Sequence, residues 1–232
     1  MNEIISQFQA EIPKFFQNFI KMLTTPKVFL EQQQKDSTKD TGLKKGLIFY
    51  CICNVLGMVF LFPVYGDAEF HNPSKFFIDI IMSIAIVVLI ALSVNISWRI
   101  VGKKRPYMEY LTFTCYQVGV ITMVWLFVGL INLSILKLHY PQIFPQVVNA
   151  TYNYQSSDLL NNWFAEPSLQ LYGAVGTFYI LWGIYWYLKQ WSVYQTLNQA
   201  SKFKTIVSMI VFITLSGIAF WPIIAAVGQM FK

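Results

Sequence analysis

Four basic side chains lie in the short polar connector between two long apolar stretches of this 232-residue chain. They are Arg99, Lys103, Lys104 and Arg105. Cations next to a hydrophobic segment can hold the head group of an anionic lipid or an acidic segment of a partner protein. The same residues can instead serve only to fix the orientation of the chain in a membrane. The sequence leaves both interpretations open.

A second set of polar residues lies inside the apolar stretches. Asn54, Asn95 and Gln117 each lie about 10 Å in from the side that the basic residues mark, at 1.5 Å per residue. Unpaired amides are costly in lipid, so we expect these three to turn inward and form one polar layer, with Ser97 and Thr114 at similar depth. The layer would be a ligand or water site open to the cytoplasm, or a set of interhelical hydrogen bonds.

No motif in the sequence predicts catalysis. There is no Gly-rich phosphate loop, no nucleophile elbow and no His-Glu-x-x-His, so we expect no catalytic residue, no cofactor and no enzymatic activity. The two histidines, His71 and His139, have no spacing that supports a metal site. Cys51, Cys53 and Cys115 fall in apolar stretches, where we expect them to pack as small apolar residues.

Long apolar segments must position these residues. Hydrophobic residues make up 56% of the chain and charged residues only 12%, whereas soluble domains have about 25% charged residues. Apolar segments of about 20 residues cross a bilayer as helices, because only a helix pairs its own backbone groups there. We therefore predict an all-α integral membrane bundle of five transmembrane helices. The spans are expected at about 46–64, 76–101, 110–136, 168–188 and 203–230, so that residues 46–232 form one transmembrane domain.

Several residues predict where the helices end and how they pack. Pro63 and Gly66 are expected to end the first span, with a polar loop over 67–75, and Pro222 is expected to kink the last span. A polar connector is predicted over 189–202. Small residues at helical spacing predict close helix packing; they are Cys115, Gly119, Gly173, Gly176 and Gly183.

Residues 1–45 are predicted to form a cytoplasmic amphipathic segment. Apolar residues recur there at helical spacing between polar ones: Phe15, Phe16, Phe19, Ile20 and Leu23. Thr25 and Pro26 predict an N-cap and the first residue of a second short helix, over about 26–34. We expect the three phenylalanines to face inward. The segment is interpreted as a membrane-surface or partner-docking element, or as helices packed under the bundle.

The distribution of Lys and Arg predicts the orientation. Basic residues gather in the N-terminal segment and in the connectors after the second and fourth spans. The opposite side holds mainly Lys75, Lys137 and Lys232, together with several acidic residues. The N-terminus is therefore predicted to be cytoplasmic. The net charge of +6 suits anionic lipid better than nucleic acid, because the chain has no basic soluble module that could bind nucleic acid.

Three stretches resemble the Yip family of five-span membrane proteins, named after Ypt/Rab-interacting protein. Phe19-Ile-Lys-Met-Leu-Thr-Thr-Pro26, with Phe29 just after it, resembles the leucine, proline and phenylalanine segment that precedes the first span of bacterial members. Residues 102–119 resemble the family's loop and early third helix, and residues 182–199 resemble its penultimate helix and polar exit.

The resemblance implies five spans, a cytosolic N-terminus and membership of membrane assemblies. Eukaryotic members carry a long hydrophilic N-terminal region implicated in Rab binding, whereas only about 45 residues precede the first span here. This difference favours a short bacterial-type member in the bacterial inner membrane. In a eukaryotic host, the alternative location would be the ER or Golgi membrane.

We expect a non-enzymatic multi-pass protein that binds membrane lipids, protein partners or both. The protein partners are of unknown identity, and the chain could serve as an accessory subunit of a membrane complex or as a homo-oligomer. The alternative is a transporter, channel or lipid-translocating protein. Transporters usually carry ionisable residues inside the membrane, and here only Asp79 comes close to the interior of a span, which weakens the alternative.

Overall fold

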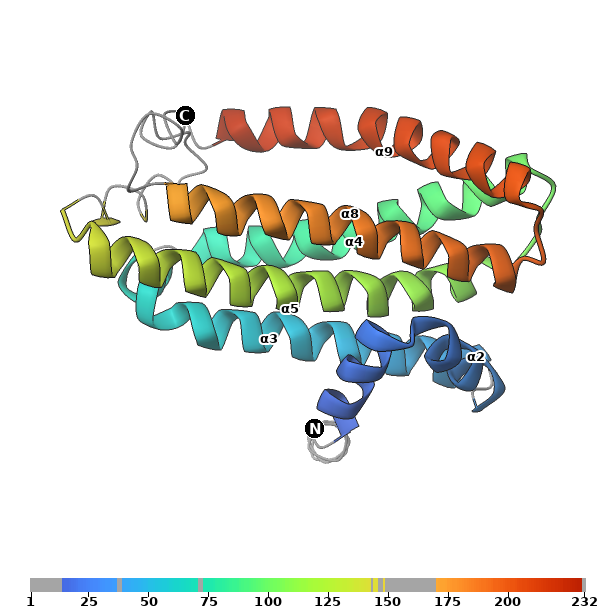
Figure 1. Ribbon diagram of the computed structural model, residues 1–232, viewed down its shortest axis with the longest axis horizontal. Coiled ribbons are helices and arrows are strands. Elements are labelled where there is room, and N and C mark those ends of the chain that lie inside the picture. The colour runs from blue at the N-terminus through green and yellow to red at the C-terminus, as the bar shows by residue number, and fades with distance from the viewer. Residues whose placement is uncertain are drawn as a thin grey trace.

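The computed structural model describes residues 14–36, 39–70, 73–142, 144–145, 148 and 170–230. This part of the chain is all-helical and contains no strand. Its long helices lie side by side (Figure 1), and they are α3 (Lys39–Phe70), α4 (Pro73–Ile100), α5 (Tyr107–His139), α8 (Gln170–Leu197) and α9 (Lys202–Met230). The short helix α2 (Pro26–Asp36) and the helical residues 14–24 lie at one end of the bundle, beside α3.

Three of the described helices are long and apolar enough to cross a membrane. The segments are Ile80–Ile100 in α4, Tyr107–His139, which is the whole of α5, and Lys202–Ala219 in α9. Length and composition therefore support a membrane protein with an all-helical fold.

The first long helix is longer than the sequence predicted. Helix α3 continues through Pro63 and Gly66 to Phe70, and α4 begins at Pro73. The predicted end of the first helix is therefore wrong, and the described residues of the predicted loop over 67–75 are helical. Proline and glycine weaken a helix by removing one backbone donor or by adding backbone freedom. A helix continues through such residues where leaving it would strand several more backbone groups without partners.

The fourth predicted span also ends later than expected. Helix α8 continues past Lys189 to Leu197, so most of the predicted polar connector is helical. Trp191, Val193 and Tyr194 are buried there, and they hold the last turns of the helix against the rest of the bundle. Helix α9 begins at Lys202, close to the prediction, and it remains helical through the position of Pro222.

Helix α5 is the centre of the bundle, with α3, α4 and α8 packed around it. The contact between α3 and α5 is the most extensive, and it needs small residues. A Cβ at Gly119 would lie 3.0 Å from both Cys53 Sγ and Phe49 Cε1, and one at Gly46 would lie 3.1 Å from a backbone oxygen of α5. The predicted close packing at Gly119 is confirmed. Helix α9 packs mainly against α4 and less against α8.

The N-terminal helical residues pack against the bundle with one side only. Phe15 is buried (2% exposed), and its ring centroid lies 5.0 Å from that of Phe49 in α3. Phe19 is half-buried, but Phe16 is 55% exposed. The expectation that all three phenylalanines face inward is therefore wrong for Phe16. Successive residues on a helix point about 100° apart, so neighbouring rings cannot share one contact face.

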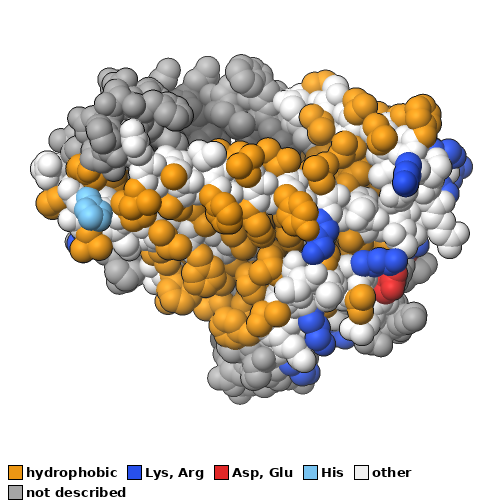
Figure 2. All heavy atoms as spheres, in the orientation of Figure 1, with side chains coloured by type: hydrophobic (Ala, Val, Ile, Leu, Met, Phe, Trp, Pro, Cys, Tyr) orange, Lys and Arg blue, Asp and Glu red, His pale blue; other side chains and the backbone are white. Residues whose placement is uncertain are grey.

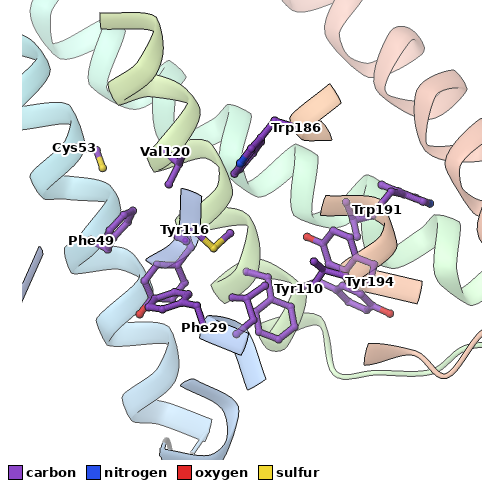
Figure 3. Close-up of a cluster of buried hydrophobic side chains, with 14 of the residues drawn as sticks. Phe29, Phe49, Cys53, Tyr110, Tyr116, Val120, Trp186, Trp191 and Tyr194 are labelled. Atoms are coloured by element: carbon purple, nitrogen blue, oxygen red, sulfur yellow. The ribbon is translucent and has the colours of Figure 1, made fainter. Parts of the chain in front are cut away.

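Helix α2 is also part of the packed structure. It begins at Pro26 as predicted, and the Phe29 ring lies edge-on to Tyr116 of α5 at 4.9 Å (Figure 3). Thr25 does not cap it through its side chain, since its Oγ1 donates to Lys21 O of the preceding turn at 3.2 Å. Lys189 Nζ of α8 donates to Thr24 O at 3.0 Å. These contacts favour helices packed under the bundle.

Candidate functional site

The basic bend between α4 and α5 is a tight helix C-cap. Gly102 adopts a left-handed conformation (φ +81°) that glycine accepts without steric cost. Its N–H bonds to Arg99 O at 3.0 Å, and Lys103 N–H bonds to Trp98 O at 2.9 Å. This pair of bonds is the Schellman motif, which satisfies the last carbonyl groups of α4. The turn fixes where the following basic side chains project.

A second Schellman motif ends α8. Gln199 takes the left-handed position (φ +47°), its N–H bonds to Thr196 O, and Ala200 N–H bonds to Gln195 O, both at 3.0 Å. Unlike glycine, glutamine is sterically strained in this conformation. No glycine marks this helix end, which is one reason why the sequence predicts an end that is too early.

Two basic side chains of the bend join these two turns. Lys103 Nζ donates to Gln199 O at 2.9 Å, and Arg105 donates to Leu197 O. Arg105 also forms an ion pair with Glu109 at 2.7 Å. Cations at a helix C-terminus stabilise the partial negative charge of its free carbonyls. Lys103 and Arg105 therefore hold α8 to the start of α5, a structural role that the sequence analysis missed.

The other two basic residues of the bend behave differently. Arg99 Nε donates to Asn95 Oδ1 on the same helix at 3.2 Å, with its side chain otherwise exposed. Lys104 is exposed, and the structure shows no hydrogen bond or ion pair of Lys104 with another described residue. Lys204 Nζ lies next to the bend, 4.0 Å from where a Cβ of Gly102 would be, and Lys202 is exposed nearby.

Most of the described basic residues share this end of the bundle. Figure 2 shows Lys and Arg side chains gathered at that end, next to a broad hydrophobic surface along the helices. We call it the basic end, and its described basic residues are Lys14, Lys21, Lys27, Lys44, Lys45, Arg99, Lys103, Lys104, Arg105, Lys189, Lys202 and Lys204. Its described acidic side chains are Glu31 and Glu109. The potential at this end is therefore positive.

The buried amide Gln117 lies in an interhelical network near the basic end. Tyr194 OH donates to Gln117 Oε1 at 2.7 Å, and Gln117 Nε2 donates to Gln190 Oε1 at 3.2 Å. About two turns nearer the bend, Tyr110 OH donates to Asn198 Oδ1 at 2.8 Å. These bonds join α5 to α8 and to Asn198 directly after it, and every residue named here is buried. The network gives the two helices a specific register.

The other two amides of the predicted layer lie elsewhere. Asn95 is buried in α4 and bonds to Arg99 of its own helix. Asn54 Nδ2 donates to Tyr50 O at 2.9 Å, and Ser83 Oγ donates to Asn54 Oδ1 at 3.3 Å, which links α3 to α4. The structure thus places the three amides in three separate sets of hydrogen bonds, without a bond between any two of them. The Ser97 and Thr114 hydroxyls also bond within their own helices.

An apolar groove separates α8 from α9 away from the basic end. It has a volume of about 520 Å³, and Tyr179, Ile180, Ile184, Met209 and Ile213 are among the residues that line it. A Cβ at Gly183 would find no neighbour within 4 Å, so the predicted close packing at this glycine is wrong. The groove is open and apolar, which suits lipid chains or an apolar helix better than a polar ligand.

The described residues show no arrangement typical of metal or thiol chemistry. Cys51, Cys53 and Cys115 are free thiols, and the last two are buried among apolar neighbours. Within the described ranges, no three His, Cys, Asp or Glu side chains come close enough to hold a metal ion. His71 lies outside these ranges, and His139 is exposed at the end of α5.

Comparison of this chain with protein-family models, with curated proteins and with solved structures found no match. The class of protein therefore follows from its own residues. An all-helical bundle with three apolar helices of membrane-spanning length is a membrane protein, and its charged side chains are concentrated at one end.

Proposed function

We propose that this chain is a non-enzymatic, multi-pass membrane protein that binds anionic lipids at its basic end. The observation that carries the proposal is the position of Lys104, Lys202 and Lys204. All three are exposed, and they lie where the polar connectors meet the apolar faces of α4, α5 and α9. Basic residues at that level attract anionic head groups, each contributing about 1 kcal/mol near a charged membrane surface.

The proposal includes five spans rather than three. Helices α3 and α8 have 32 and 28 residues, so each is at least about 40 Å long, more than the roughly 30 Å hydrocarbon core of a bilayer. The basic end would then face the cytoplasm, together with the N-terminal helix. Five spans and a cytosolic N-terminus are also what the resemblance to the Yip family implies, and a bacterial inner membrane remains the proposed location.

Exposed apolar helix faces leave room for protein partners as well. Phe178, Leu181 and Tyr185 project from α8 and are each more than 60% exposed. These side chains face lipid or a neighbouring apolar helix, which is compatible with an accessory subunit or a homo-oligomer. A transporter or channel, the alternative function, would need a polar path through the bundle. The groove between α8 and α9 is apolar, so it favours lipid over a polar substrate.

Counting bound lipids tests the proposed function. We would purify the chain in mild detergent and measure bound phosphatidylglycerol and phosphatidylcholine by native mass spectrometry. We expect a preference for phosphatidylglycerol that falls by up to about fivefold for each of Lys104→Ala, Lys202→Ala and Lys204→Ala. Lys137→Ala, an exposed lysine at the opposite end, is the matched control and should change little. Equal binding of both lipids by the unchanged chain would contradict the proposal.

A further inference from the structure

A small cavity lies at the basic end, between the N-terminal helical residues and the bundle. Its volume is about 140 Å³, and its walls come from residues 14–18, α2, the start of α3 and the first third of α5. A cavity of this size can hold several water molecules, but sites for drug-sized ligands are larger, at about 300–1,000 Å³. The cavity therefore suits a small group, alone or as part of a larger molecule.

One part of the cavity wall is cationic and rich in donors. Lys14 and Lys45 supply ammonium groups, and Asn18 and Gln33 supply side-chain amides. Tyr116 OH donates to Gln33 Oε1 at 3.5 Å, so the amide nitrogen of Gln33 remains a donor. No carboxylate is among the described residues that line the cavity. Ammonium and amide groups are hydrogen-bond donors that suit the oxygen atoms of a phosphate group.

The other part of the wall is apolar, and it sets the depth of the cavity. Ile48, Phe49 and Ile52 follow Lys45 along α3 and line the cavity with Phe15. The distance along the helix from Lys45 to Ile52 is about 10 Å. The cavity thus begins at the last lysine before the apolar part of α3 and reaches into that apolar part. In a membrane, this is the level at which lipid phosphates meet the hydrocarbon chains.

We propose that this cavity binds a phosphate group and that binding fastens the N-terminal helix to the bundle. The inference rests on the proposed function only for the position of the basic end at a membrane surface. A phosphate held there would contact Lys14 and Asn18 from one helix and Lys45 from another, so it would join elements that are separate in the chain. A lipid head group and inorganic phosphate share this chemistry, and experiment separates these two sources.

Limited proteolysis tests the inference. Phe16 is exposed and offers chymotrypsin a cleavage site, but the protease needs the helix to leave the bundle and unfold locally. We would measure cleavage after Phe16 by mass spectrometry in three samples. They are phosphatidylcholine nanodiscs, the same nanodiscs with added inorganic phosphate, and nanodiscs with equal parts of phosphatidylglycerol and phosphatidylcholine. We expect at least one phosphate source to slow cleavage by about fivefold, the effect of one lysine near an anionic surface.

Variants at neighbouring lysines show whether the cavity causes the protection. Lys45→Met should lose it, and Lys45→Arg, which keeps the charge, should keep it and show that position 45 tolerates substitution. Lys44→Met is the matched control, because it removes the same charge one residue earlier from a side chain that does not line the cavity. Equal protection of Lys45→Met and of the unchanged chain would overturn the inference. It would also be overturned if neither inorganic phosphate nor phosphatidylglycerol slowed cleavage.

Protection by phosphatidylglycerol alone would identify a lipid head group, and protection by inorganic phosphate would identify a site for the free ion. The lipid count described above separates this inference from the proposed function. Lys45-dependent protection by inorganic phosphate in a chain that shows no preference for phosphatidylglycerol would support the cavity and contradict the proposed function. Loss of protection in Lys104→Ala with no loss in Lys45→Met would overturn the cavity and leave the proposed function standing.

Discussion

The basic end and the opposite half of the bundle are held together in different ways. At the basic end, helix termini, buried tyrosines and amides bond across helices, as with Tyr194 and Gln117 or Arg105 and Leu197. Away from it, α8 and α9 separate around an apolar groove, and α8 exposes large apolar side chains such as Phe178. Specific pairing is therefore concentrated at the basic end within the described residues.

The physical reason for this difference lies in the surroundings that we propose for each half. Lipid tails pack on apolar side chains about as well as another helix does, so apolar helix faces alone specify little inside a membrane. Near the membrane surface, polar groups must be paired or hydrated, and each pairing selects one arrangement of the helices. The basic end would thus define the fold, and the opposite half would leave surface for lipid or partners.

Two glycines of α5 test this comparison, and the largest effect is expected here. Gly119→Leu should push α3 and α5 apart, because even a Cβ there would lie 3.0 Å from Cys53 and Phe49. Overpacking of this kind costs about 1–3 kcal/mol. Gly129→Leu, which meets nothing within 4 Å, should cost little. Thermal unfolding in detergent measures the stability of both variants. An equal loss of stability in the two would mean that the two halves of the bundle pack alike.

Two adjacent basic residues of the bend sharpen the comparison. Arg105→Ala removes the bond to Leu197 O and the pairing with Glu109, and the loss should be about 1–2 kcal/mol, since both groups are partly exposed. Lys104→Ala should leave the unfolding temperature nearly unchanged while it weakens lipid binding. If both variants lost the same stability, the division between structural and surface-binding cations would be wrong.

The amides provide a third test. Gln117→Leu leaves the buried Tyr194 hydroxyl and Gln190 without their partner and should cost about 1 kcal/mol. Asn95→Leu removes one bond within its own helix, so its effect should be smaller. The double variant should lose the sum of the two values to within about 0.5 kcal/mol, because the residues share no partner. Clear non-additivity would instead support a single polar layer.

The smallest expected effect is a gain in stability. Gln199→Gly should relieve the strain of the left-handed conformation at the end of α8, offset in part by the greater freedom of glycine in the unfolded chain. We expect a net gain of about 0.5 kcal/mol in thermal unfolding. A loss of stability would mean that the glutamine side chain makes a favourable contribution larger than the strain.

The sequence predicted what depends on long apolar runs and strong local signals. The positions of α4, α5 and α9, the short connector between α4 and α5, and the start of α2 at Pro26 follow from such signals. The extension of α8 was missed because its last turns are rich in polar residues. The spacing of these residues is nevertheless typical of a helix with one buried face. The buried residues are Gln190, Trp191, Tyr194, Leu197 and Asn198.

The contacts of the candidate site were predicted less well, because they form between residues that are distant in the chain. Nothing local indicates that Arg105 reaches Leu197 or that Gln117 meets Tyr194, because both contacts depend on how α5 and α8 are placed. Equal depth suggested one layer of amides, but depth does not fix which way a side chain points around a helix. The sequence also predicts a short surface helix around residues 159–164, and this segment lies outside the described residues.

The central claim is that the basic end faces the cytoplasm and the other end faces the opposite side of the membrane. Lys104→Cys and Leu138→Cys test it, each in a chain whose Cys51, Cys53 and Cys115 have been replaced. Leu138 is 78% exposed at the far end of α5, so both new thiols should be accessible. With a membrane-impermeant maleimide, Leu138→Cys should be labelled in intact cells and Lys104→Cys only after permeabilisation. Labelling of both from the same side, or the reverse pattern, would contradict the account.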